Sequence, residues 1–113
     1  MEEIKTVLEK YNNFKDAQIR SVDHVSETSK IVNIGIDDDY GQEIASVKII
    51  FNNVTKSKIL QNSVLAFLDM MSGISIVHEN GLYGFALGND SAMLHVHLAP
   101  MYIIASEVSI EEN

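Results

Sequence analysis

Apolar residues recur with a helical period at the start of the chain and then change to the alternation typical of strands. They stand at Ile4, Val7, Leu8 and Tyr11, with charged residues between them. This spacing predicts an amphipathic helix of about three turns. The helix should end near residues 12–13, because asparagine tolerates the left-handed conformation in which helices commonly end.

Short runs rich in isoleucine and valine follow, separated by polar clusters. Residues 17–25 predict a weak first strand and residues 30–37 a clearer one. The polar cluster at residues 37–43 has the composition of a turn, and residues 44–52 alternate again. We therefore expect a hairpin at this point.

A second helical period occupies the middle of the chain. Asn62 or Ser63 suits its N-cap and Gly73 suits the position after its end. We expect a helix over residues 63–72 with Met71 packed in the core. The apolar positions that carry this prediction are Leu60, Val64, Phe67, Leu68 and Met71.

The dipeptide Asn80-Gly81 is the strongest local signal in the sequence. A type I′ turn requires positive φ at both central residues, and this pair adopts such angles readily. A two-residue loop fixes the register of residues 74–79 against residues 82–87. One face of this hairpin, which we expect to face the core, then carries Ile74, Ile76, His78, Tyr83, Phe85 and Leu87.

Residues 93–98 alternate as well and predict a strand with Leu94, Val96 and Leu98 inward. Pro100 separates it from a final strand over residues 101–110. That strand has apolar side chains on both faces, more than a free edge usually tolerates. We expect it either inside the sheet or in a homodimer that forms through it.

These elements predict a single α+β domain over residues 1–113. We expect the N-terminal helix and one further helix to pack on a mainly antiparallel sheet, built from hairpins and a meander, of about six or seven strands.

The charge of the chain excludes several classes of partner. It has 16 acidic and 8 basic residues, a net charge of −8, and Arg20 is its single arginine. Nucleic acids and anionic membranes are therefore unsuitable partners, because both bind through clustered lysine and arginine. The sequence has no secretory signal or apolar span, so we expect a cytoplasmic protein.

The charges are also distributed unevenly. Lys58 is the last basic residue, so residues 59–113 carry six acidic side chains and none that is basic. Either this half supplies most of the buried core, or its exposed acids form a field that steers a basic partner. The residues that we expect at such a partner interface are Asp37, Asp38, Asp39, Asp69, Glu79, Asp90 and Glu107.

His95 and His97 are the strongest candidates for metal ligands in the sequence. On a strand they would project from one face about 7 Å apart, close enough to chelate one metal ion. A third ligand is needed, and His78 would point to the opposite face. The alternative interpretation is a pair of solvent-facing or interface histidines.

Three segments of the first half carry a resemblance. They are Phe14-x-Asp16-Ala17-x-Ile19-x-x-Val22, Val32-x-Ile34-x-Ile36-Asp37-Asp38 and Val47-x-Ile49-x-Phe51-x-Asn53-Val54. Together they resemble small bacterial β-rich proteins, some of which look like immunity proteins of polymorphic toxin systems. The resemblance implies a small binding protein and brings no catalytic residue.

The sequence therefore favours a non-catalytic binding module without a cofactor, for example an immunity-type inhibitor of a basic protein partner. One alternative is a small metal-dependent or histidine-assisted enzyme that uses His95 and His97, with Glu107 or Asp90 as acid or base. The other is a structural subunit that assembles with itself.

Overall fold

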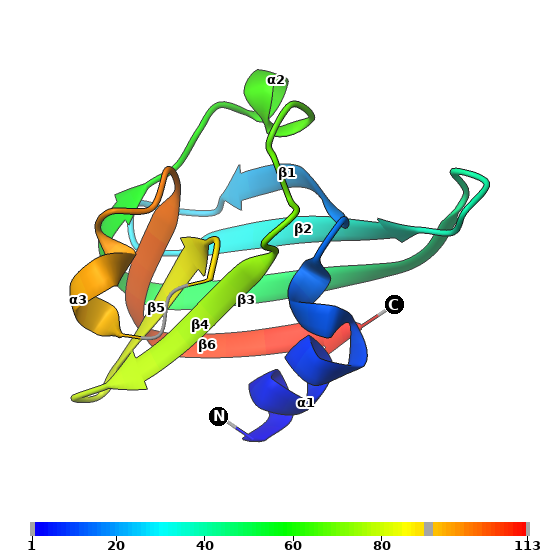
Figure 1. Cartoon of the computed structure of the whole chain (residues 1–113). Helices are drawn as coiled ribbons and strands as arrows, with labels where there is room; N and C mark the ends of the chain where they lie inside the picture. Colours follow the sequence, from blue (N-terminus) through cyan, green and yellow to red (C-terminus); the bar gives the residue numbers. More distant parts are fainter. Residues whose placement is uncertain (1, 90–91, 113) are drawn as a thin grey trace.

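The structure is a computed structural model and describes residues 2–89 and 92–112. Its described residues form a six-stranded sheet with short helices around it (Figure 1). In chain order the elements are α1 (Glu2–Lys10), η1 (Asn12–Phe14), β1 (Gln18–His24), β2 (Lys30–Asp37), β3 (Glu43–Lys58), α2 (Asn62–Leu65), β4 (Ile74–Glu79), β5 (Leu82–Leu87), α3 (Met93–Val96) and β6 (Tyr102–Glu112).

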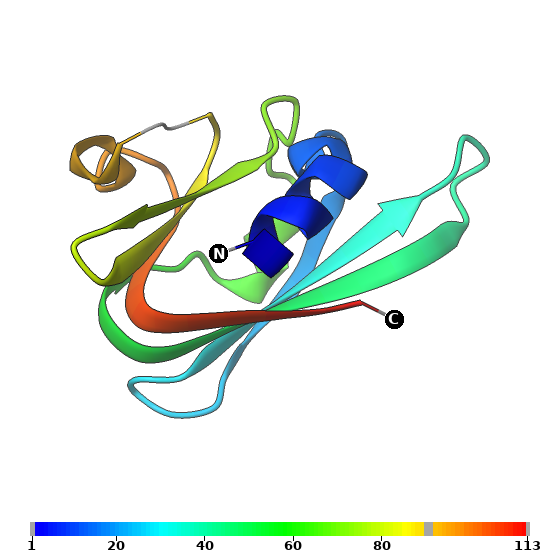
Figure 2. The same ribbon diagram turned by 90° about the horizontal axis from the view of Figure 1, so that it is seen from below.

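The strands lie in the order β1-β2-β3-β6-β5-β4. Every neighbouring pair is antiparallel. The α+β class and the antiparallel sheet are therefore as predicted. Figure 2 shows that β3 and β6 curve together, so that the sheet has a concave side, where α1 lies.

Strand β6 lies inside the sheet, which explains its apolar composition. It pairs with β3 along its whole length and with β5 over Tyr102–Ala105. Of the two positions expected for this strand, the structure shows the covered one. The reason for expecting a homodimer through β6 is thereby removed.

The hairpin β4–β5 has the predicted register. Asn80 and Gly81 both have positive φ, 52° and 76°. Ile76 lies opposite Phe85, and Ile74 lies opposite Leu87. The turn chemistry alone was enough to align these two strands.

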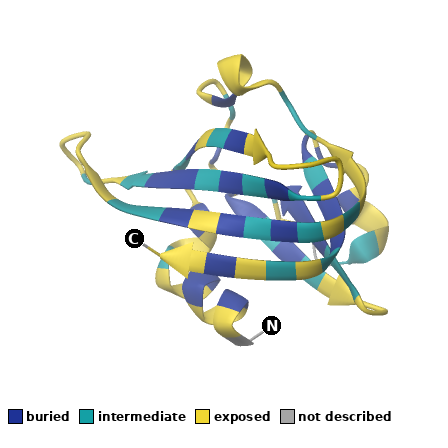
Figure 3. Cartoon of the chain, turned by 180° about the vertical axis from the view of Figure 1, so that it is seen from behind, coloured by how far each residue is buried: buried dark blue, intermediate teal, exposed yellow. Residues whose placement is uncertain are grey.

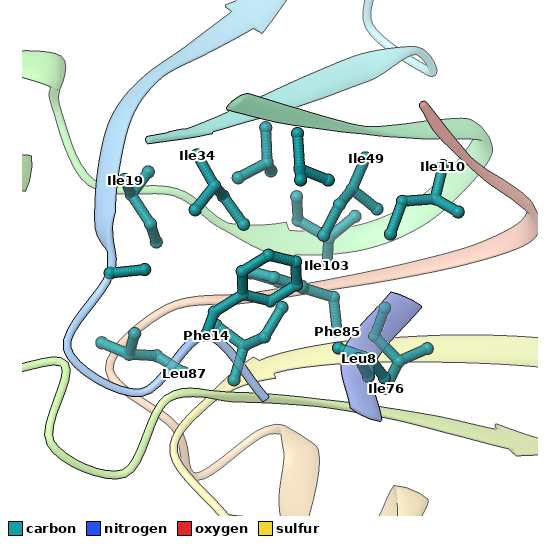
Figure 4. Close-up of a cluster of buried hydrophobic side chains, with 14 of the residues drawn as sticks. Leu8, Phe14, Ile19, Ile34, Ile49, Ile76, Phe85, Leu87, Ile103 and Ile110 are labelled. Carbon is teal, nitrogen blue, oxygen red and sulfur yellow. The ribbon is translucent and has the colours of Figure 1, made fainter. Parts of the chain in front are cut away.

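The core lies on the concave side of the sheet, and Figure 4 shows part of it. Ile4, Val7 and Leu8 of α1 are buried in the same cluster as side chains from all six strands. Figure 3 shows the opposite face, where buried and exposed residues alternate along the strands. This alternation is typical of an antiparallel sheet with one solvated face.

The predicted helix over residues 63–72 is wrong. Helix α2 ends at Leu65, and the chain continues through turns to Gly73. Phe67 and Met71, expected in the core, are 86% and 73% exposed, whereas Met70 is 7% exposed. Two separate buried side chains, Leu65 and Met70, attach this segment to the core, and no continuous helical stripe does so.

The predicted strand over residues 93–98 is also wrong. Residues 93–96 form α3, which packs on the outer face of the sheet through Val96. Leu94 and Leu98, expected inward, are 79% and 81% exposed. Gly84 allows α3 to pack closely, because its missing side chain leaves room for Met93 and Val96 against the sheet.

No helix within residues 2–89 and 92–112 is long and apolar enough to cross a membrane.

Candidate functional site

Three aspartates from separate parts of the chain line one shallow pocket of about 380 Å³. Asp16 precedes β1, Asp37 ends β2, and Asp69 follows α2. Neither lysine nor arginine is among the lining residues. We call this site the acidic pocket and define it by Asp16, Asp37 and Asp69. Its other lining residues are Ala17, Gln18, Ala66, Leu68, Met70 and Met71.

An unusual backbone positions Asp16. Residues 12–14 and Asp16 all have positive φ, which is rare outside glycine. The Asp16 N–H donates to the carbonyl oxygen of Met70 at 2.9 Å. Gly73 fits against this segment because a Cβ there would collide with the Asn13 carbonyl oxygen. The segment therefore places a charged residue at the pocket at the cost of backbone strain.

Asp37 is held by Arg20. The Arg20 Nη2 lies 2.9 Å from Asp37 Oδ1, and its Nε lies 3.3 Å from Glu43 Oε1. The third nitrogen, Nη1, donates to Gln18 Oε1. Asp37 and Glu43 face each other directly across β2 and β3, and the guanidinium relieves the repulsion between these two carboxylates.

Asp69 lines the pocket together with its sequence neighbours Leu68, Met70 and Met71. Asp69 Oδ1 accepts a hydrogen bond from the Met71 N–H at 2.9 Å, which closes a tight local turn. The exposed side chains of Phe67 and Met71 stand on either side of this aspartate in the sequence. The pocket thus combines carboxylates with apolar surface.

The remaining acidic residues at the β2–β3 turn have different roles. Asp38 Oδ1 accepts hydrogen bonds from the N–H groups of Tyr40 and Gln42, so this carboxylate shapes its own turn. Asp39 is exposed. Tyr40 is exposed as well, in the turn between β2 and β3.

The other predicted interface residues lie elsewhere. Glu79 Oε2 accepts a hydrogen bond from the Met93 N–H at 2.7 Å, so Glu79 anchors the start of α3. Glu107 is exposed on β6, opposite Asn52. Asp90 lies outside the described residues. Of the seven residues expected at a partner interface, the pocket brings together Asp37 and Asp69.

The fold reduces the charge imbalance seen along the sequence. Glu111 of β6 lies directly opposite Lys48 of β3. Glu112 Oε2 lies 2.7 Å from Lys10 Nζ and 2.8 Å from the Tyr11 hydroxyl. Hydrogen bonds from Lys10 and then Tyr11 lower the pKa of Glu112, and the hydrogen bond to Glu112 raises the pKa of both donors. The two C-terminal glutamates are therefore locally compensated.

The two histidines do not have the geometry of the predicted chelate. His95 lies in α3 and His97 directly follows it in helical conformation. Residues i and i+2 of a helix point in different directions, so the same-face geometry of a strand is lost. Within the described parts of the chain, no three histidine, aspartate or glutamate side chains are grouped to hold a metal ion.

Sequence reasoning missed the contributions of Asp16, Gln18 and Arg20. One signal was present: Gly35 interrupts a strand that is otherwise rich in isoleucine and valine, which indicates a close approach at that point. Arg20 is the group that approaches, because a Cβ on Gly35 would collide with its Nε.

Comparisons with known proteins place the chain in no family. No family model matches it, and neither a curated protein nor a solved structure matches it significantly.

Proposed function

We propose that this chain is a non-catalytic binding module that captures a basic segment of a partner protein at the acidic pocket. The observation that carries the proposal is that Asp16, Asp37 and Asp69 line one pocket whose lining includes no lysine or arginine, with Arg20 paired to Asp37 beside it. Such a surface attracts lysine and arginine side chains and repels acidic ones. An immunity-type inhibitor of a basic toxin is one protein of this class.

The surroundings of the pocket support a protein partner. Met71, which lines the pocket, is exposed, and so is Phe67, which follows the lining residue Ala66 in the sequence. Aromatic residues and methionine are enriched at protein interfaces, where they supply contact area around charged groups. The positive φ of Asp16, which lines the pocket, is a further feature found at functional sites.

The proposal is tested with a short synthetic peptide of arginine and leucine and its glutamate–leucine counterpart. Binding to the protein is followed by fluorescence anisotropy. The triple variant Asp16→Asn, Asp37→Asn and Asp69→Asn removes the charges but keeps the shape, and asparagine tolerates positive φ at position 16. Three exposed charge pairs of about 0.5 kcal/mol each predict a loss of affinity of about tenfold.

The matched control removes three exposed charges away from the pocket, with Glu3→Gln, Glu9→Gln and Glu27→Gln. It should weaken binding of the arginine–leucine peptide by less than about twofold, since only long-range attraction is lost. Equal losses in the two triple variants would show that net charge alone attracts the peptide and would refute the pocket.

A further inference from the structure

Arg20 lies at an irregularity in strand β1. Along β1, Ile19 pairs with Ile34 and Ser21 pairs with Asn33, so Arg20 is the extra residue of a β-bulge. Bulges turn a side chain out of the regular strand pattern and are frequent beside functional sites. The bulge turns Arg20 toward the end of β2 that borders the acidic pocket.

Each nitrogen of this guanidinium has its own acceptor. Nε faces Glu43, Nη1 faces Gln18, and Nη2 faces Asp37. Gly35 forms the floor, where a Cβ would overlap Arg20 Nε and Glu43 Oε1 in their present positions. Three acceptors around a flat floor fit the planar, five-donor guanidinium and do not fit the compact ammonium of lysine.

The Arg20 site is also open to exchange. The side chains of Arg20, Asp37 and Glu43 are 40%, 35% and 47% exposed. Ion pairs this exposed contribute little to stability, so an external guanidinium can compete with Arg20. Two of the three acceptors, Gln18 and Asp37, also line the acidic pocket.

We propose that the acceptors Gln18, Asp37 and Glu43 form a guanidinium-binding site, which Arg20 occupies in the free protein and an arginine of the partner takes over on binding. The inference rests on the proposed function in taking the partner to be basic. It goes beyond that function by assigning a specific side chain, arginine, to a specific set of acceptors.

The first test is chemical rescue of the Arg20→Ala variant. Because exposed ion pairs are weak, ethylguanidinium should bind this variant only at about 10–100 mM, seen as saturable shifts of the amide NMR signals around the site. Ethylammonium at the same concentration should shift these signals less. Adding Gln18→Ala, Asp37→Asn and Glu43→Gln to Arg20→Ala should abolish the effect. An Arg20→Ala protein that is folded but does not bind ethylguanidinium would overturn the site.

The second test measures exchange with the arginine–leucine peptide. Arg20→Ala should bind it at least about fivefold more tightly than the unmodified protein, because no internal competitor has to be displaced. Lys48→Ala is the control, since it removes one exposed positive charge of the same sheet. The gain with Arg20→Ala should exceed the gain with Lys48→Ala, and should be smaller for a lysine–leucine peptide.

The two proposals fail separately. If Arg20→Ala and Lys48→Ala bind the arginine–leucine peptide equally well, or if Arg20→Ala binds it more weakly than the unmodified protein, the exchange is excluded. The acidic pocket would still stand if its triple variant loses affinity as expected. If instead ethylguanidinium binds but the triple variant retains peptide affinity, the proposed function is wrong and the guanidinium site remains.

Discussion

Gly73 and Gly81 both require positive φ, yet their surroundings differ. Gly81 has open space where a Cβ would lie, whereas Gly73 is packed against the Asn13 carbonyl oxygen. Gly81→Ala should therefore lower the free energy of unfolding by about 1–2 kcal/mol, the cost of the backbone conformation alone. Gly73→Ala adds a collision and should lower it by about 3 kcal/mol or more.

Urea unfolding followed by circular dichroism measures both glycine variants. Equal midpoints would mean that Gly73 does not pack on the residue 12–16 segment. In that case the position of Asp16 at the pocket would also be in doubt.

Glu112 makes the attachment of α1 to β6 dependent on pH. Its pKa lies below the ordinary value of 4.5 because Lys10 and Tyr11 donate to its carboxylate. The carboxylate therefore stabilises the fold above pH 4.5, and this contribution is lost as the pH falls through the lowered pKa.

The variant Glu112→Gln should be less stable than the unmodified protein near pH 7, and the difference should disappear under strongly acidic conditions. Melting temperatures across this range measure the effect. Glu3→Gln, an exposed change on α1, is the control and should show no such dependence. A difference between Glu112→Gln and the unmodified protein that stays constant with pH would contradict the assigned contact.

For single residues, the sequence predicts the backbone conformation where that conformation depends on the residue itself. Asn80 and Gly81 reveal their turn because positive φ is a property of the residues themselves. The position of Asp16 has no such local signature, since its N–H donates to the carbonyl oxygen of Met70, far away in the sequence. The acidic pocket joins three segments that are far apart in the chain, so no short sequence motif predicts it.

The segment between β3 and β4 offers a direct comparison of two adjacent residues. Met70→Ala should destabilise the protein by about 2–4 kcal/mol because it empties a buried position. Met71→Ala should change stability by less than about 0.5 kcal/mol, since this side chain is exposed. Denaturant unfolding of the two variants distinguishes the observed turns from a helix over residues 63–72, which would bury Met71 instead.

The two incorrect predictions, the helix over residues 63–72 and the strand over residues 93–98, were based on periodicities that the sequence does contain. Residues 60–71 have helical spacing, but tertiary contacts bury Leu65 and Met70 and leave Phe67 outside. Residues 93–98 alternate, yet so short an apolar run fits a strand and a helix equally well. The surface on which residues 93–96 pack includes Gly84, which lies in another part of the sequence.

At the β1 edge of the sheet a side chain occupies one backbone donor. The Val22 N–H of the outermost strand β1 donates to Asn62 Oδ1 at the start of α2. A filled donor cannot recruit a strand from another molecule. The short helix α2 therefore has a protective role that its length does not suggest.

At the scale of the whole molecule, β6 is the only strand that joins β1–β2–β3 to β4–β5 within the described sheet. A chain truncated after Met101 should therefore lack a cooperative thermal transition and a dispersed amide NMR spectrum. Addition of a peptide with the sequence of residues 102–112 should restore the thermal transition and the dispersed spectrum, because it can pair with β3 and β5. A truncated chain that melts cooperatively by itself would contradict this central role.

The position of β6 also determines when the protein can fold in the cell. A ribosome adds about 5–20 residues per second, so β3 emerges several seconds before its partner. During that interval Val47, Ile49 and Phe51 lack one of their two neighbouring strands, since β2 is already made but β6 is not. Nascent chains in this condition are exposed to aggregation. Slow codons over residues 59–101 should therefore lower the yield of folded protein, whereas the same codons before residue 43 should not.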